Sequence, residues 1–432
     1  MCIPPRSRNI RLPMLLMASL AIAATAQPSD AGNDLPKLIV PNRKTAMKIS
    51  LPLPAKRGLP DGKTCLLKEI DGAAVDTVGQ WDKSIAGDGS VAKDMAELIA
   101  VIPPGDGSTP TREFQILPKP DTKNEQKSSF QFQPKNKNTL TLLEGPRPVL
   151  AYNYGVITGK NVPENEFRRH RAAYVHPIWG LDGEVLTDDF PRDHYHHHGL
   201  FWSWPHVSID GRDHDLWMSR NIRHKFVKWL DRETGPVAAV LGVENGWFVG
   251  ERKVMIERVW LRVFKAAKDS QAIDVHLTWI PVDHPISLLG AEGKSYGGLS
   301  LRYNIGPKNQ PTISVPKGVT KDDLKITRLP WADLTAMFPK DGEPRSKAKI
   351  HSGATLMVNP DHPDFPPTWL TRHYGILCIG WPGVNTKTFP PGEPFSLSYR
   401  VWIHKGMLDS TQISAVYKDY AAGESEAKWD GK

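Results

Sequence analysis

Four histidines, one phenylalanine and two tryptophans fall within twelve residues, in the stretch DHYHHHGLFWSW from Asp193 to Trp204. Imidazole transfers protons near neutral pH, binds metal ions and hydrogen-bonds hydroxyl groups. The stretch therefore admits an acid–base site, a metal site, a sugar-binding surface or a crowded piece of core. We expect Trp202 and Trp204 to be core residues, because large aromatic side chains on a strand are usually buried.

The histidines are clustered along the chain. Nine of the fifteen lie between His170 and His224, a window in which even scattering would place about two. Arginines, aspartates and tryptophans are interleaved with them, and carboxylates tune every reaction of imidazole. Such clustering needs a cause, although structural hydrogen bonding beneath a loop remains an alternative to function.

Candidate groups for proton transfer come from this window and from one strand beyond it. His196, His197 and His224 are the candidate acids, and Glu257 in MIERVW is the candidate base. By alternation Glu257 shares a strand face with apolar neighbours (Met255, Val259 and Leu261), so we expect burial to raise its pKa. An ion pair with an arginine on a neighbouring strand is the competing role for Glu257.

A metal site is the second possibility for the segment. If the residues are extended, the side chains of His194, His196 and His198 point to one side, and three imidazoles suit zinc with an open position for water. The His-Glu-x-x-His spacing of zinc hydrolases is absent. The sequence thus requires no cofactor, and zinc or another divalent metal on these histidines remains the alternative.

A polar strand face is predicted in GLSLRYNI, where Arg302 lies on the same side as Ser300 and Asn304. Arg400 and His404 alternate with apolar residues in the same manner. Such faces either meet solvent or line the concave side of a sheet, where they would bind hydroxyls or a uronate. Gly297 and Gly298, just before Arg302, favour close backbone approach.

The elements that must position these groups are mainly strands. Apolar residues alternate with polar ones in several runs, and no βαβ rhythm is present. Predicted strands span 147–157, 252–264, 272–282, 298–305, 354–360, 374–380 and 394–405. One helix is predicted near the end, capped by Ser410 and followed by Gly423. The expected fold is mainly β: a large antiparallel β-sandwich with a small N-terminal β domain and a C-terminal helix.

The ends and the composition set the class of protein. The predicted organisation is a signal peptide at 1–26, a linker at 27–44, a small β domain at 45–118, a polar connection at 119–140, the sandwich at 141–423 and a tail at 424–432. Cleavage near Ala26 predicts a secreted or periplasmic protein without an integral membrane segment.

The net charge and the positions of the cysteines exclude further classes of protein. The formal charge is +8 and the signal contributes three arginines and no acids, which leaves 8 − 3 = +5. These charges are dispersed, so nucleic acid is not expected as a partner. Cys65 and Cys378 are too far apart in sequence to suggest a disulfide framework.

Several motifs occur in an order that resembles an exported bacterial family labelled "methane oxygenase PmoA". They are FPRDHYHHHGLFW, DHDLWMSRNIRH, MIERVW, SYGGLSLRY and a late block beginning PPTWLTRHYG and continuing through FPPGEPF. The resemblance covers roughly residues 145–406. His198 stands where the family pattern has arginine, and Leu216 where it commonly has phenylalanine. An arginine, which stays protonated at physiological pH, is thus replaced by a histidine, which can lose its proton.

The resemblance implies a galactose-mutarotase-like supersandwich and, by fold-level analogy, carbohydrate chemistry. Methane oxidation is not expected, because that subunit spans a membrane and no spanning helix is predicted here. The residues that the motifs assign to substrate binding are Asp193, His194, His198, Trp217, Arg302, Trp369, Arg372 and Tyr374.

We therefore expect an exported carbohydrate-active protein, with an epimerase, lyase or hydrolase reaction by histidine and carboxylate acid–base chemistry and a sugar or glycoside as its partner. The alternatives are a glycan-binding module without chemistry and a histidine-ligated metalloprotein.

Overall fold

The computed structural model describes residues 36–54, 63–70, 76–118, 128–306, 310–340 and 347–430. The predicted signal peptide and the first part of the predicted linker lie outside these residues, as do residues 119–127 of the predicted connection. The described residues are mainly strands in antiparallel sheets with one α-helix, α1 (Ser410–Ser425), which confirms the predicted fold class.

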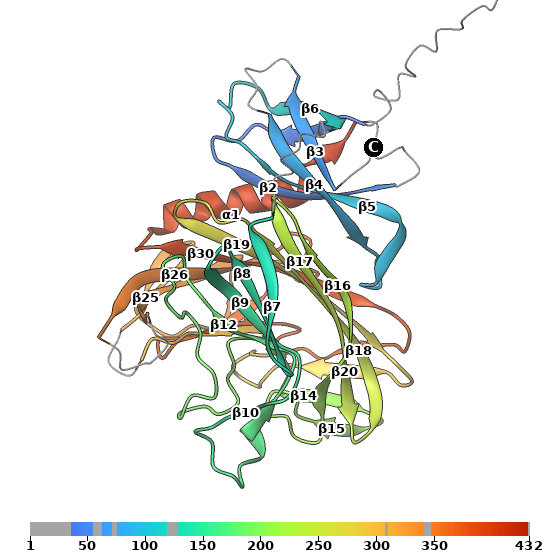
Figure 1. Cartoon of the computed structure of the whole chain (residues 1–432). Helices are drawn as coiled ribbons and strands as arrows, with labels where there is room; N and C mark the ends of the chain where they lie inside the picture. Colours follow the sequence, from blue (N-terminus) through green and yellow to red (C-terminus); the bar gives the residue numbers. More distant parts are fainter. Residues whose placement is uncertain are drawn as a thin grey trace, which may run out of the picture. The chain divides into compact units, whose positions relative to one another are not determined.

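Two nine-stranded sheets face each other and form the large sandwich (Figure 1). The first sheet carries the histidine segment and contains, in spatial order, β24 (Lys325–Arg328), β27 (Thr368–Arg372), β28 (Ile376–Gly380), β21 (Gly298–Arg302), β13 (Leu200–Ser203), β12 (Tyr174–Ile178), β9 (Arg147–Asn153), β8 (Thr139–Glu144) and β7 (Phe130–Asn136). The second contains β16 (Arg223–Thr234), β17 (Ala238–Val249), β18 (Arg252–Phe264), β19 (Ser270–Pro281), β30 (Phe395–Lys405), β26 (Lys349–Val358), β25 (Trp331–Pro339), β22 (Thr312–Val315) and β23 (Gly318–Thr320).

Alternation explains how the second sheet divides its side chains. On β19, Ile273, Val275 and Leu277 are buried in the core shared with the first sheet, whereas Asp274 and His276 point to the outer face. Burying the apolar set stabilises the sandwich, because each large aliphatic side chain removed from water contributes about 1.5–3 kcal/mol. Trp202 and Trp204 of the first sheet lie in the same core, as predicted.

A seven-stranded sheet is built from both ends of the described chain. Its order is β2 (Met47–Pro54), β5 (Val91–Ile102), β4 (Thr77–Ile85), β3 (Thr64–Glu69), β6 (Thr111–Pro118), β1 (Leu38–Pro41) and β31 (Lys428–Trp429). Leu38 pairs with both Phe114 of β6 and Trp429 of β31. Residues 38–41, expected in the linker, are therefore a strand, and so are residues 428–429, expected in the tail.

Smaller sheets complete the described fold. β10 (Ile157–Thr158) pairs with β11 (His170–Arg171), which a short 3₁₀ turn, Phe167–Arg169, precedes. A four-stranded sheet has the order β15 (Arg212–His214), β14 (His206–Ile209), β20 (Ile286–Leu289) and β29 (Lys387–Phe389). None of the helices in the described ranges is long and apolar enough to span a bilayer.

The N-cap of helix α1 lies one residue earlier than predicted. Asp409, not Ser410, is the N-cap: its carboxylate accepts from the backbone N–H groups of Thr411 and Gln412, each at 2.8 Å. The Gln412 side chain accepts in return from the Asp409 N–H, which completes a capping box. Gly423, predicted to follow the helix, lies inside its last turn, and α1 continues to Ser425.

Packing accounts for the state of the two cysteines and for the two consecutive glycines. Cys65 and Cys378 are both buried and free, and burial raises the pKa of each thiol to about 12. Gly297 and Gly298 have φ of 142° and 118°, and a Cβ on Gly298 would lie 2.8 Å from the Ile379 carbonyl oxygen. The predicted close backbone approach is confirmed.

Candidate functional site

The histidine segment folds into two successive turns. The His194 N–H donates to the Pro191 carbonyl at 3.0 Å, and the His197 N–H donates to the His194 carbonyl at 2.9 Å. Strand β13 begins only at Leu200. The extended conformation that would have placed His194, His196 and His198 on one side is therefore wrong, because the turns rotate each imidazole into a different direction.

The turns stack three rings at the surface. The His194 ring is nearly parallel to those of His197 and Tyr374, with centroids 4.5 Å and 4.9 Å away and interplanar angles of 1° and 12°, and the His197 and Tyr374 rings are themselves 6.3 Å apart, so the three parallel rings are offset from one another. His196 meets His197 edge-on, with ring centroids 4.6 Å apart. Tyr374 is 37% exposed, whereas His197 is buried. The structure thus brings together four of the predicted residues as a ring stack that runs from the interior to solvent.

Arg302 lies beside this stack on β21. Its Nη2 donates to both carboxylate oxygens of Asp193 at 3.1 Å, and its guanidinium lies 5.0 Å from the centroid of the Tyr374 ring. Its side chain is almost fully buried, yet Nε and Nη1 have no hydrogen-bond partner among the described residues. Buried donors in native proteins are normally paired, so these two atoms indicate a missing oxygen-rich partner.

Sheet order explains how Arg302 reaches the histidines. β21 pairs with β13, which follows the histidine turns, and the Arg302 N–H donates to the Gly199 carbonyl at 2.8 Å. The Arg302 carbonyl accepts from the Asp188 N–H at 3.1 Å, which places the Asp188 carboxylate near the guanidinium, with its Oδ2 4.0 Å from Nε.

Two carboxylates next to Arg302 differ in acidity. Burial raises the pKa of Asp188 to about 6, although Arg302 opposes the shift. Burial also favours the neutral form of Asp193, but hydrogen bonds and charge from His194 and Arg302 outweigh it and lower its pKa to about 2. Asp188 was missed among the site residues; its only sequence signal was the acidic pair at 188–189 just before the histidine turns.

The inner histidines are neutral near pH 7. Burial, followed by the charges of His194 and Arg168, lowers the pKa of His196 to about 3, and burial lowers the pKa of His197 well below its usual value. The Nδ1 atoms of both have no partner among the described residues. They therefore suit hydrogen bonding to a ligand rather than the predicted role of proton donors.

The remaining predicted contact residues lie further inside. His198 is buried, with Nδ1 2.7 Å from Asp189 Oδ1. Trp217 packs edge-on against His197 at 5.9 Å, and Trp369 is core, with Nε1 donating to the Leu329 carbonyl. The half-buried Arg372 donates to the carbonyls of Leu324 and Thr371. Among these four residues, it is Trp217 that packs directly against the ring stack.

The predicted metal set does not converge, since the ring of His198 faces Asp189 instead of His194 and His196. Across the parts of the chain that the structure describes, no group of three or more histidine, cysteine, aspartate or glutamate side chains is arranged to hold a metal ion.

Glu257 lies at the centre of the sandwich, with its side chain fully buried. Its Oε2 accepts from the indoles of Trp247 at 2.8 Å and Trp279 at 3.0 Å and lies 3.2 Å from His224 Nε2, and its Oε1 accepts from Asn245 at 3.0 Å. Burial alone would raise its pKa, but His224 and the indole donors lower it to about 2. The predicted upward shift is wrong, because the groups around the carboxylate favour its ionised form.

A family comparison places most of this structure in one group. Residues 139–418 match the model of the "Family of unknown function (DUF6807)". The chain belongs to this family. A comparison with curated proteins found no match. The matched segment contains both nine-stranded sheets except β7, together with the ring stack, Arg302 and the two carboxylates. The resemblance to the PmoA-labelled family remains a prediction.

Proposed function

We propose that this protein binds an acidic saccharide at Arg302 and acts on it by acid–base chemistry. The observation that carries the proposal is the buried guanidinium, whose Nε and Nη1 make no hydrogen bond to the described residues, beside a partly exposed ring stack. Guanidinium donors are well suited to carboxylate oxygens, and charge-assisted hydrogen bonds are stronger than neutral ones. A uronate supplies both a carboxylate for Arg302 and hydroxyls for the free Nδ1 atoms of His196 and His197.

The two carboxylates supply the acid–base chemistry in this proposal. Asp188, with a pKa of about 6, holds a proton in mildly acidic solution and serves as the acid; Asp193, with a pKa of about 2, stays ionised and serves as the base. Carboxylates whose pKa values are pushed apart are the pattern expected of such pairs. The reaction is of the epimerase, lyase or hydrolase type, with His196 and His197 as hydrogen-bond partners in place of the histidine acids.

Three further parts of the proposal rest on the sequence. The motif order resembles the exported PmoA-labelled family, and the β-sandwich is consistent with a mutarotase-like supersandwich, an analogy that favours carbohydrate substrates. The N-terminal signal supports a secreted or periplasmic location.

Binding of a matched pair of sugars tests the proposal. We expect wild-type protein to bind galacturonate at least about tenfold more tightly than galactose in titration calorimetry. Arg302→Ala should lose this preference, whereas the control Arg252→Ala, at an exposed arginine paired with Asp210, should keep it. An Arg302→Ala protein that still prefers galacturonate contradicts the proposal.

A binding module without chemistry is the second candidate, because the outward ring of Tyr374 stacked on His194 offers a flat aromatic surface to a sugar. Overnight incubation with an oligogalacturonide, followed by chromatography, separates the two functions. Binding without product favours the module.

A further inference from the structure

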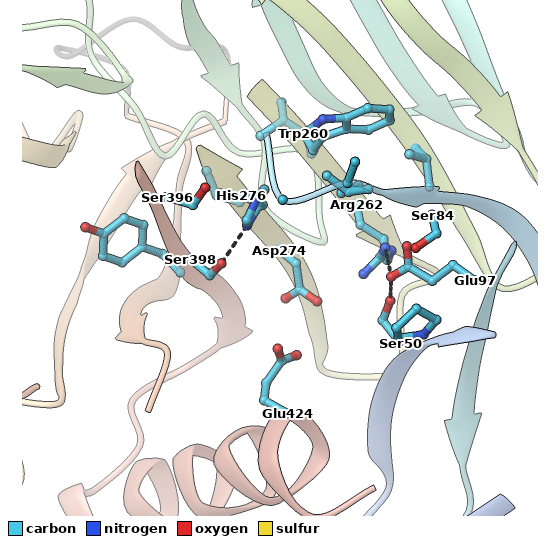
Figure 2. Close-up of a pocket in the computed structure, with 18 of the residues that line it drawn as sticks. Ser50, Ser84, Glu97, Trp260, Arg262, Asp274, His276, Ser396, Ser398 and Glu424 are labelled. Carbon is cyan, nitrogen blue, oxygen red and sulfur yellow. Dashed lines mark hydrogen bonds and ion pairs between the residues drawn. The ribbon is translucent and has the colours of Figure 1, made fainter. Parts of the chain in front are cut away.

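A cavity lies on the outer face of the other nine-stranded sheet, and none of its lining residues belongs to the ring stack. Its volume is about 440 Å³, within the range of about 300–1,000 Å³ typical of small-molecule sites. Its walls come from β18, β19 and β30 of the sandwich, from β2, β4 and β5 of the seven-stranded sheet, and from α1. Figure 2 shows these side chains around a common space.

The floor of the cavity is a ladder of side chains on three adjacent strands. Trp260 pairs across the sheet with His276, and His276 pairs with Ser398. His276 Nδ1 lies 2.8 Å from the Ser398 hydroxyl, and burial lowers the pKa of His276 to about 4, so the imidazole is neutral. These rows are the outward set of the same alternation that buries the apolar residues in the core.

The charges around the cavity cancel in pairs. Arg262 donates to Glu97 at 2.6 Å, and Arg400, behind the wall, donates to Asp274 at 2.8 Å. Glu424 of α1 points toward Asp274 (Figure 2). Burial and the charge of Asp274 raise the pKa of Glu424 to about 7. Glu97 and Asp274 are thus each paired with an arginine, and Glu424, with a pKa of about 7, is only partly ionised near neutral pH.

Several hydroxyls line the cavity, and two of them already make one hydrogen bond, that of Ser396 with Thr278 and that of Ser398 with His276, each at 2.8 Å. The hydroxyls of Ser84, Ser396 and Ser398 line the cavity, and each can donate one hydrogen bond and accept others. Balanced donors and acceptors without net charge, beside the indole of Trp260, match a neutral polyhydroxylated molecule better than an ion.

We infer that this cavity is a second ligand site, for a neutral saccharide unit, formed jointly by the sandwich, the seven-stranded sheet and α1. The wall residues Ser50, Ser84, Glu97 and Glu424 lie outside the segment that matches the family, residues 139–418. The site thus depends on parts of the chain that the family segment alone does not supply, and it is separate from the proposed uronate site at Arg302.

Gly87 provides a way to block the cavity without straining the backbone. It lies on the cavity wall, a Cβ added there meets no atom within 4 Å, and its φ is not in the left-handed region. Gly87→Trp should therefore fold, and it adds an indole at a residue that lines the cavity. Lys93→Trp is the matched control, because Lys93 is exposed on β5 and does not line the cavity. Ser398→Ala, which removes one floor hydroxyl, is an independent second variant.

The test measures binding of cellobiose, xylobiose and lactose as neutral probes and spermidine as a cationic one, by ligand-observed NMR with each at up to about 10 mM. We expect wild type, Lys93→Trp and Arg302→Ala to bind at least one neutral disaccharide equally well. Gly87→Trp should bind that disaccharide at least about tenfold more weakly, and Ser398→Ala should bind it severalfold more weakly.

Three results would overturn the inference: no neutral disaccharide bound by wild type, unchanged binding in Gly87→Trp, or binding of spermidine alone. The inference would also be overturned if Arg302→Ala lost disaccharide binding while Gly87→Trp kept it, because neutral sugars would then bind at the Arg302 site. Loss of galacturonate preference in Arg302→Ala depends on the first site only, so the two proposals fail separately.

Discussion

Individual residues in this protein owe their chemistry to what surrounds them more than to their type. Asp188 and Asp193 are both carboxylates beside Arg302, yet burial raises the pKa of the first to about 6, while hydrogen bonds from His194 and Arg302 lower that of the second to about 2. Glu257 is more deeply buried than either and still has a low pKa, because donors surround it. The hydrogen-bond donors and charges around each carboxylate therefore decide whether its pKa is raised or lowered.

Uronate binding should depend on pH through Asp188. The charged groups that face it are Arg302, Asp189 and Asp193. As the pH rises through about 6, Asp188 gains a negative charge 4.0 Å from the Arg302 Nε, so galacturonate affinity should fall by about fivefold between pH 5 and 7.5. Asp188→Asn should remove this dependence. Calorimetry at both pH values checks it, and an unchanged slope in the variant contradicts the assignment.

Glu257 should be a stability residue. In Glu257→Gln an amide N–H₂ faces indole donors, so we expect a loss of about 1–3 kcal/mol in the free energy of unfolding. The control Glu251→Gln alters a 93% exposed side chain and should change it by less than about 0.5 kcal/mol. Urea denaturation measures both.

The pH dependence of that stability has a defined sign. The folded-state pKa of Glu257 is about 2, below its usual 4.5, so its stabilisation is complete above about pH 4.5 and is lost as the pH falls toward 2. If Glu257→Gln were as stable as Glu251→Gln, the negative charge of Glu257 would not be needed to stabilise the fold beside the indole donors.

Strands could be predicted from the sequence where only one of their two faces is apolar. Strand β19, Ser270–Pro281, was predicted at 272–282, because apolar and polar residues alternate from Ile273 to Trp279. Strand β17 was not singled out, since it is buried along most of its length and carries no alternation. The histidine segment was not among the predicted strands, and the extended conformation considered for its metal site is replaced by two turns, at Pro191–His194 and His194–His197.

The cap of α1 offers a direct comparison between the predicted and the observed helix start. Asp409→Ala removes the acceptor of two backbone N–H groups and should cost about 1 kcal/mol of stability. Ser410→Ala, at the predicted cap, should change it by less than about 0.5 kcal/mol. Thermal unfolding of the two variants measures the difference, and a larger loss in Ser410→Ala would restore the predicted cap.

At the scale of the whole molecule, the contacts that make the site come from sheet order, which the sequence did not reveal. The histidine cluster predicted a convergence of imidazoles, and the structure stacks two of its four rings with Tyr374 and places a third, that of His196, edge-on against them. The ion pair of Arg302 with Asp193 could not be foreseen, because it requires β21 to lie next to β13 across a long separation in sequence. Pairing over such distances depends on all the strands at once.

The seven-stranded sheet should depend on its final strand. Trp429 is buried in that sheet's core, and its Nε1 donates to the Pro52 carbonyl at 2.8 Å. Trp429→Ala should destabilise this sheet by about 3–5 kcal/mol, whereas Lys428→Ala, at the exposed neighbour, should have little effect. Faster amide hydrogen exchange in β1 and β6 of the first variant would report the loss; equal exchange in both would mean that β31 is dispensable.

The pairing of β1 with both β6 and β31 also constrains biosynthesis. Residues 38–118 leave the ribosome early, but their sheet stays one strand short until residue 429 has been made. Until then β1 presents an open edge, which is a hazard for wrong pairing between nascent chains. A cell that makes this protein thus has reason to keep its early residues unfolded, or attended by a chaperone, until the last strand has been made.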